Sequence, residues 1–132
     1  MPYLLDTNIV SDLVRRPHGR VVERIRMVGE AEVCTSIIVA AELRYGAAKK
    51  GSARLTSQLE AVLGALQVLP FEASADATYG TLRARLERAG QMIGGNDLLI
   101  AAQAVTLGVT LVTDNEREFG RISELSLENW VR

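Results

Sequence analysis

The chain has 132 residues, 48% of them hydrophobic and 23% charged, a balance that suits one compact globular domain over residues 1–132 and excludes a disordered chain. The net charge is −1, with 15 basic and 16 acidic residues, so the overall charge gives no support to nucleic-acid binding. Cys34 is the only cysteine, which excludes an internal disulfide. We see neither a signal peptide nor an apolar run of the ~20 residues that a membrane span needs, so we expect a cytoplasmic protein.

Short apolar runs alternate with amphipathic stretches along the chain, and their spacing predicts the elements. In chain order we expect a strand at Tyr3–Leu5, a helix at about 20–29, a strand at Val33–Thr35, a helix at Ile37–Lys50 and a helix from about Leu55 to Leu66. There follow a strand at Val68–Leu69, a helix from Ala75 to near Gly90, a helix from Gly94 to about Leu107, a strand at Val109–Val112 and a short strand near Leu125–Trp130. Strands that alternate with helices predict a parallel sheet covered on both faces.

Polar residues follow two of the predicted strands directly. Asp6, Thr7 and Asn8 come after the first strand, and Thr113–Asn115 come at the end of a later strand. Because the carboxyl ends of parallel strands lie at one edge of a sheet, where ligands bind, we expect both groups at that edge. Capping of the helix that follows explains Asp6 equally well.

Two further acids lie within predicted helices. Glu42 is surrounded by apolar residues, a setting in which a carboxylate usually needs a partner, although an exposed Glu42 paired with Arg44 is the alternative. Asp97 lies in the first turn of the most hydrophobic predicted helix, where interaction with the helix N-terminus alone would explain it. Gly94 and Gly95 precede it, and we expect them to let the backbone approach a bound group closely.

Several acids at one edge of a sheet repel one another and need a cation. Carboxylate oxygens favour a hard ion, Mg²⁺ with Mn²⁺ as a substitute. Zinc is disfavoured because the only soft or imidazole ligands, Cys34 and His18, lie in unrelated segments, His18 in a predicted turn. A carboxylate-held Mg²⁺ suits phosphodiester hydrolysis, since the ion acidifies water and a second ion can stabilise the leaving oxygen.

Two segments are locally basic despite the balanced total. Five arginines lie in the first segment and three cations in the second: Arg15, Arg16, Arg20, Arg24 and Arg26, then Lys49, Lys50 and Arg54. Such patches can contact phosphates, and solvated helix faces and turns explain each patch equally well.

Four motifs carry a resemblance to a known family. They are Leu4–Asn8, Ala41–Gly46, Gly95–Ala101 and Leu111–Asn115, in that order. Together they resemble the PIN domain, specifically the VapC-type toxins of prokaryotic toxin–antitoxin pairs. The ends Arg117–Ile122 and Glu128–Trp130 are similar to that subgroup too, so the likeness spans nearly the whole chain.

The resemblance implies an α/β/α sandwich, Mg²⁺-dependent endoribonuclease activity on structured RNAs such as tRNA, inhibition by a cognate VapB-type antitoxin, and a homodimer. By matching position, it implies that Asp6 and Asp97 are the main metal ligands. Glu42 would complete the acidic site, directly or through water, with Thr7 and Thr113 as supporting polar groups.

The late-strand motif departs from the family pattern. Many PIN domains place a fourth acid two residues after the Thr that ends this strand, and Asn115 stands at that position here. Asp114 comes one residue earlier and is a candidate catalytic acid, while Glu118, Asn115 and Asn8 are candidate supporting groups. The identity of the fourth group and the number of metal ions, one or two, both stay open.

Two other α/β families are excluded by the residues that they would need. A haloacid-dehalogenase phosphatase requires a second Asp at the position of Asn8, and a response-regulator receiver domain requires a late Lys, whereas none follows Lys50. The remaining alternative is a catalytically weak PIN fold that acts as a regulatory or RNA-binding module through its antitoxin complex. Asn115 keeps this alternative open, and the three matching acids argue against it.

Overall fold

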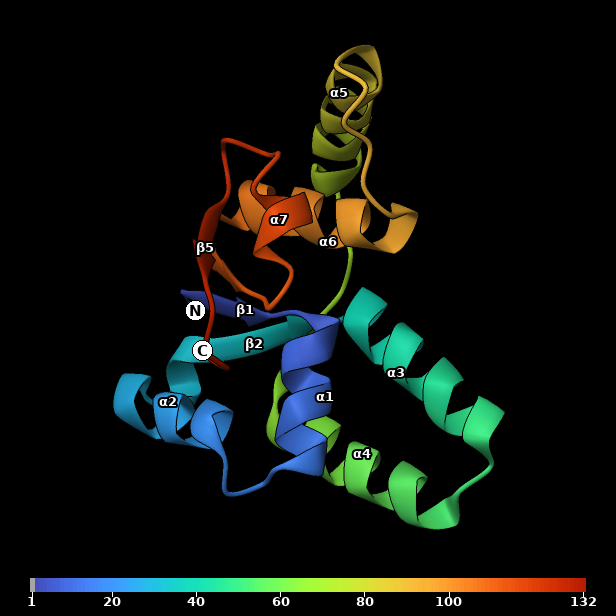
Figure 1. Cartoon of the computed structure of the whole chain (residues 1–132), viewed down its shortest axis with the longest axis vertical. Helices are drawn as coiled ribbons and strands as arrows, with labels where there is room; N and C mark the ends of the chain where they lie inside the picture. Colours follow the sequence, from blue (N-terminus) through green and yellow to red (C-terminus); the bar gives the residue numbers. More distant parts are fainter. Residues whose placement is uncertain (1) are drawn as a thin grey trace.

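The protein, described over residues 2–132 by a computed structural model, is built on one five-stranded sheet (Figure 1). Its strands are β1 (Tyr3–Leu5), β2 (Val33–Ser36), β3 (Gln67–Leu69), β4 (Thr110–Val112) and β5 (Ser126–Glu128). The strand order is β3-β2-β1-β4-β5, and all four neighbouring pairs are parallel. The predicted parallel sheet is therefore confirmed, with β1 at its centre.

Helices cover both faces of the sheet. They are α1 (Thr7–Arg15), α2 (Arg20–Val28), α3 (Ile37–Lys50), α4 (Ala53–Ala65), α5 (Ala75–Arg88), α6 (Gly95–Leu107) and α7 (Glu116–Phe119), with a 3₁₀ turn at Glu30–Glu32. Figure 1 shows α1 to α4 below the sheet and α5 to α7 above it, which confirms the three-layer arrangement. α5 stacks on the outside of α6. Over the described residues, no helix combines the length and the apolar character needed to cross a bilayer.

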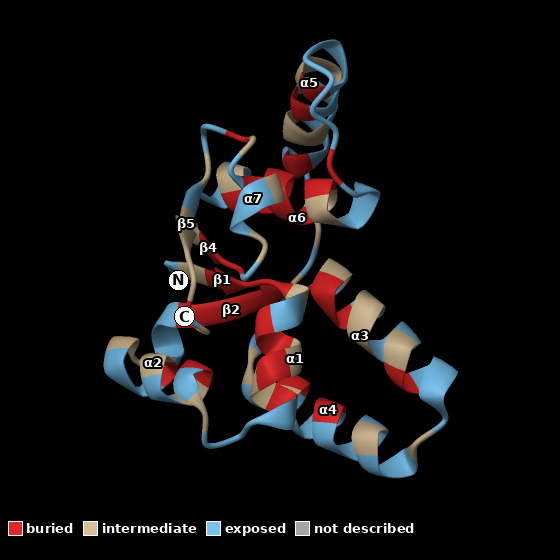
Figure 2. Cartoon of the chain, in the orientation of Figure 1, coloured by how far each residue is buried: buried red, intermediate tan, exposed pale blue. Residues whose placement is uncertain are grey.

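The central strands are buried on both faces, as Figure 2 shows for β1, β2 and β4. Leu4 and Leu5 of β1 and Leu111 and Val112 of β4 have no exposed surface. Strands between two helical layers read as continuous apolar runs instead of alternating patterns, which is why they could be recognised in the sequence.

Two helices were missed by the sequence analysis. α1 was left unassigned, although Ile9, Val10, Leu13 and Val14 have the i, i+1, i+4, i+5 spacing of one helical face. α7 has four residues, too few for a periodic pattern. The other predicted elements are all present, with ends that differ by only a few residues.

A buried polar contact joins the two helices that carry Glu42 and Asp97. Ser36, at the end of β2, accepts a hydrogen bond from the Ile38 N–H of α3 (3.0 Å) and donates one to Oε1 of Gln103 on α6 (2.5 Å). The Gln103 amide in turn donates to the Pro70 carbonyl (3.0 Å), beyond β3. The contact therefore fixes α3 and α6, which cover opposite faces of the sheet, relative to each other at the end of β2.

We expect Gln103→Leu to lower the free energy of unfolding by about 1–3 kcal/mol, because it leaves the buried Ser36 hydroxyl without its acceptor and the Pro70 carbonyl without its donor. Urea denaturation measures this loss. The control is Gln58→Leu on the exposed surface of α4, which should change stability by less than about 0.5 kcal/mol. Equal stabilities for the two variants would contradict the structural role of Gln103.

Candidate active site

Asp6 is a buried carboxylate at the carboxyl end of the central strand, with 3% of its surface exposed. Its backbone N–H donates to the Val112 carbonyl (2.9 Å), and the Thr113 hydroxyl donates to its Oδ2 (2.8 Å). The side chain does not cap α1, so helix capping does not explain it. Among the described residues, no group hydrogen-bonds the buried Oδ1 atom of Asp6. A buried carboxylate oxygen without a partner is costly, and this one is available to a ligand.

The loop after β4 connects Asp6 to α7. The Thr113 hydroxyl that contacts Asp6 also accepts a hydrogen bond from the Asn115 N–H (3.0 Å). The Asn115 side-chain amide donates to Oε2 of Glu118 (2.7 Å). Asn115 therefore has a structural role here, since its side chain holds the Glu118 carboxylate in place.

Glu42 lies where three helices meet. The Thr7 hydroxyl of α1 donates to its Oε1 (2.6 Å), and the Asn96 amide of α6 donates to its Oε2 (3.3 Å). Arg44, the alternative partner, instead forms a two-fold ion pair with Glu60, both contacts at 2.9 Å. The sequence analysis missed Asn96, whose only signal was its position directly before Asp97.

The charges of three other acids act on Asp97. Burial, the largest cause, and the nearby carboxylates of Asp6, Glu42 and Glu118, in that order, together raise the pKa of Asp97 from 3.8 to about 6. Burial also raises the pKa of Asp6, against the lowering effect of the Thr113 hydroxyl. Since charge effects weaken with distance, these shifts identify a cluster of four acids, which we call the acidic cluster: Asp6, Glu42, Asp97 and Glu118.

Asp114 lies beside the acidic cluster and makes different contacts. Its carboxylate accepts a hydrogen bond from the Asn129 amide (2.9 Å) and pairs with Arg132 (3.5 Å). Its backbone N–H donates to Oδ1 of Asn8 (3.4 Å). Of the candidates for the fourth group, Glu118 rather than Asp114 therefore acts on the charge of Asp97.

The two glycines before Asp97 are not required by close packing. A Cβ at Gly95 would meet nothing within 4 Å, and one at Gly94 would contact Oδ2 of Asp97 at an ordinary 3.7 Å. The expectation that they permit a close backbone approach therefore has no support in the packing of the protein.

The donor set of the acidic cluster fits a divalent cation. It supplies carboxylate oxygens only, one of them the unpartnered Oδ1 of Asp6, and its mutual repulsion would be offset by positive charge. In residues 2–132, no three Asp, Glu, His or Cys side chains form a cage that could hold an ion by themselves. Mg²⁺ commonly keeps several waters and binds through one or two carboxylates, so it does not require such a cage.

We expect Asp97→Asn to stabilise the metal-free protein at pH 7 by up to about 3 kcal/mol, the equivalent of a two-unit rise in pKa. Because the pKa of Asp97 is raised on folding, its ionised form destabilises the fold above pH about 6, and this effect disappears as the pH falls below 3.8. The stability difference between variant and wild type should therefore shrink between pH 7 and pH 4.

Chemical denaturation in EDTA across this pH range measures the difference. Glu72→Gln, at an exposed acid that has no ion pair among the described residues, is the control and should stay within about 0.5 kcal/mol of wild type. An Asp97→Asn protein no more stable than wild type at pH 7 would contradict the repulsion inferred for the acidic cluster.

Comparison with known proteins agrees with this geometry. The family model for the PIN domain matches residues 3–125. The chain is 40% identical to ribonuclease VapC2 of Rickettsia felis over 132 residues, which cover 98% of each chain. It is 34% identical over 131 residues to the tRNA(fMet)-specific endonuclease VapC of Shigella flexneri, again with 98% of each chain covered.

The fold agrees equally well with a solved structure. VapBC2 from Rickettsia felis, crystallised with a DNA fragment from its promoter, superimposes with a TM-score of 0.90 at 38% identity, over 98% of this chain and 99% of the other. Matches of this length and identity, together with acids at the carboxyl edge of a parallel sheet, lead to one assignment. The chain belongs to the PIN domain family and, within it, to the VapC-type ribonucleases.

Proposed function

We propose that the protein is a Mg²⁺-dependent endoribonuclease toxin that hydrolyses phosphodiester bonds in structured RNA. One observation carries the proposal: a buried, unpartnered oxygen of Asp6 lies beside Asp97, on which the charges of Asp6, Glu42 and Glu118 act together. Such a cluster destabilises the fold and is best explained by the ion and the phosphate that it binds. The names of the relatives, ribonuclease and endonuclease, support the same reaction.

In this proposal Asp6 and Asp97 hold the ion, and Mn²⁺ can replace Mg²⁺. When bound, the ion would stabilise negative charge on the phosphate and acidify the attacking water. The surrounding residues fix the ligands: Thr113 orients Asp6, while Thr7 orients Glu42 through its 2.6 Å hydrogen bond. Hydrogen bonds that hold Asp6 and Glu42 in place lower the rearrangement needed when the ion binds.

Glu42, on α3, and Glu118, on α7, complete the proposed site. Glu42 is held by α1 and α6, and Glu118 by the Asn115 amide. In the alternative of a catalytically weak module, Asn115 would mean the loss of a fourth acid. The charge that Glu118 exerts on Asp97 instead favours a complete acidic site, so we favour the enzyme.

Structured RNA is the proposed substrate class, and tRNA the first RNA to test. The Shigella flexneri relative is named as specific for tRNA(fMet), and a tRNA substrate would place the enzyme in the cytoplasm. We also propose a VapB-type antitoxin as its inhibitory partner and a homodimer as its assembly. The VapBC2 complex from Rickettsia felis supports the antitoxin partner.

We expect purified, antitoxin-free protein to cut total tRNA into discrete fragments with Mg²⁺ and not with EDTA. Asp6→Asn should lower the cleavage rate by roughly 100-fold or more, because it removes a charged ligand and leaves the fold intact. Gel electrophoresis of labelled RNA measures both effects. Cleavage that survives EDTA and Asp6→Asn would refute the proposed site, and an enzyme that cuts neither tRNA nor ribosomal RNA would favour the regulatory module.

The fourth acid can be tested separately. Glu118→Gln should lower cleavage by about 10- to 100-fold, because it removes one charge of the acidic cluster while the amide contact with Asn115 can persist. Glu116→Gln, on the same short helix, is the matched control and should leave the rate within about twofold of wild type. Equal rates for the two variants would exclude Glu118 from the site.

A further inference from the structure

A polar cavity of about 490 Å³ opens beside the acidic cluster, and we call it the arginine cavity. The later part of α1, the turn that leads to α2 and the loop after β4 form its walls. Arg15, Arg16 and Arg20 line it together with Asp12, and Asn8 and Asp114 line the side nearest the acidic cluster. The proposed catalytic residues do not line it.

Both aspartates of the arginine cavity are already paired. Asp12 forms an ion pair with Arg16, one turn further along α1, and Asp114 pairs with Arg132. Neither Asp12 nor Asp114 is therefore paired with the other two arginines of the cavity, Arg15 and Arg20. In the part of the chain that the structure describes, Arg15 and Arg20 have no carboxylate partner.

The two free arginines make only weak contacts with backbone carbonyls. Nε of Arg15 donates to the Ser11 carbonyl at 3.4 Å, and Nη1 of Arg20 donates to the Val131 carbonyl at 3.5 Å. Both side chains are exposed, so their guanidinium groups can turn toward an anion at little cost. The N-terminus of α2 adds backbone N–H groups nearby, because its N-cap Gly19 has no capping side chain.

A short chain of contacts connects the arginine cavity to the acidic cluster. Thr113 donates to Asp6, and the next residue, Asp114, donates its N–H to Asn8 in the cavity wall. α1 runs from Thr7, beside Glu42, to Arg15, a rise of roughly 12 Å at about 1.5 Å per residue. A strand cut at the acidic cluster would therefore need only a few nucleotides to reach Arg15.

We propose that the arginine cavity binds backbone phosphates of the RNA that flank the cleaved bond, with Arg15 and Arg20 as the phosphate-binding residues. This inference rests on the proposed ribonuclease function. Guanidinium groups suit phosphate oxygens because they can donate two parallel hydrogen bonds. A chain of net charge −1 can still attract RNA locally, since Arg15 and Arg20 lie at one cavity without carboxylate partners among the described residues.

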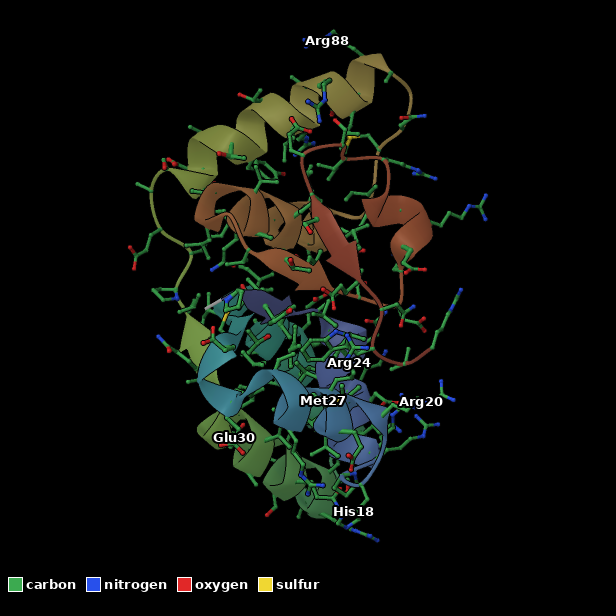
Figure 3. All side chains as sticks on the ribbon, turned by 90° about the vertical axis from the view of Figure 1, so that its left-hand side faces the viewer. His18, Arg20, Arg24, Met27, Glu30 and Arg88 are labelled. Atoms are coloured by element: carbon green, nitrogen blue, oxygen red, sulfur yellow. The ribbon has the colours of Figure 1, made fainter. Side chains whose placement is uncertain are left out.

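The test compares RNA binding by three proteins: wild type, the double variant Arg15→Gln/Arg20→Gln, and Arg88→Gln. Arg88 is exposed and, within the described residues, has no carboxylate partner, and Figure 3 shows it at the opposite end of the molecule from Arg20 and His18. Fluorescein-labelled total tRNA is the probe, and fluorescence anisotropy is recorded in EDTA at several salt concentrations. EDTA prevents metal-dependent cleavage, so binding is measured independently of activity.

We expect the double variant to bind tRNA roughly 10- to 100-fold more weakly than wild type at low salt. The slope of log K against log salt should fall in magnitude by roughly 1.4–1.8, the loss of two phosphate contacts. Arg88→Gln should bind as wild type does. Thermal melting of all three proteins checks that they remain folded, and the change in salt slope is a readout that a purely structural defect would not produce.

The proposal would be overturned if the double variant bound tRNA with the affinity and salt slope of wild type. It would also be overturned if Arg88→Gln weakened tRNA binding as much as the double variant does. Loss of antitoxin binding with unchanged tRNA binding would also overturn it, because the cavity would then serve the protein partner. Failure of the ribonuclease function has a different signature: tRNA binding that depends on both arginines, without any cleavage in Mg²⁺.

Discussion

The parallel pairing of β1 with β4 determines where the charged groups of this protein lie. Leu5 is in register with Val112, so the next residues, Asp6 and Thr113, leave the sheet side by side. Backbone and side-chain hydrogen bonds between the two strand ends then stabilise the Asp6 carboxylate, whose burial is unfavourable by itself. A one-residue slip in this register would move Thr113 away from Asp6 and reverse the face of every side chain in the strand.

The core and the acidic cluster make opposite demands on the same scaffold. The buried residues of the central strands and of the middle of α6 supply the apolar burial that stabilises the fold. At the edge of that core, burial and the nearby carboxylates of Asp6, Glu42 and Glu118 together raise the pKa of Asp97 to about 6. The apolar interior is what makes this possible, because rigid packing keeps Asp6 and Asp97 from relaxing apart.

Much of the fold could be predicted from the sequence, because strands buried between two helical layers are continuous apolar runs. Which acids converge was harder to predict, since the direction of a side chain after a strand depends on the loop backbone. Asp114 and Glu118 were both candidates, and only the Asn115–Glu118 contact and the short α7 separate them. Gln103 carried an unused signal: a polar residue inside an otherwise apolar helix usually has a buried partner.

The sheet order also bears on how the protein is made. β1 (Tyr3–Leu5) is synthesised about a hundred residues before its neighbour β4, which begins at Thr110. A nascent chain that lacks β4 already contains Asp6, Glu42 and Asp97, but it has no Thr113 to orient Asp6, and one edge of its β1 strand has no neighbour. Contacts between such distant segments form late in folding. The hydrogen bond that orients Asp6, and with it the proposed site, can therefore form only after β4 has been synthesised.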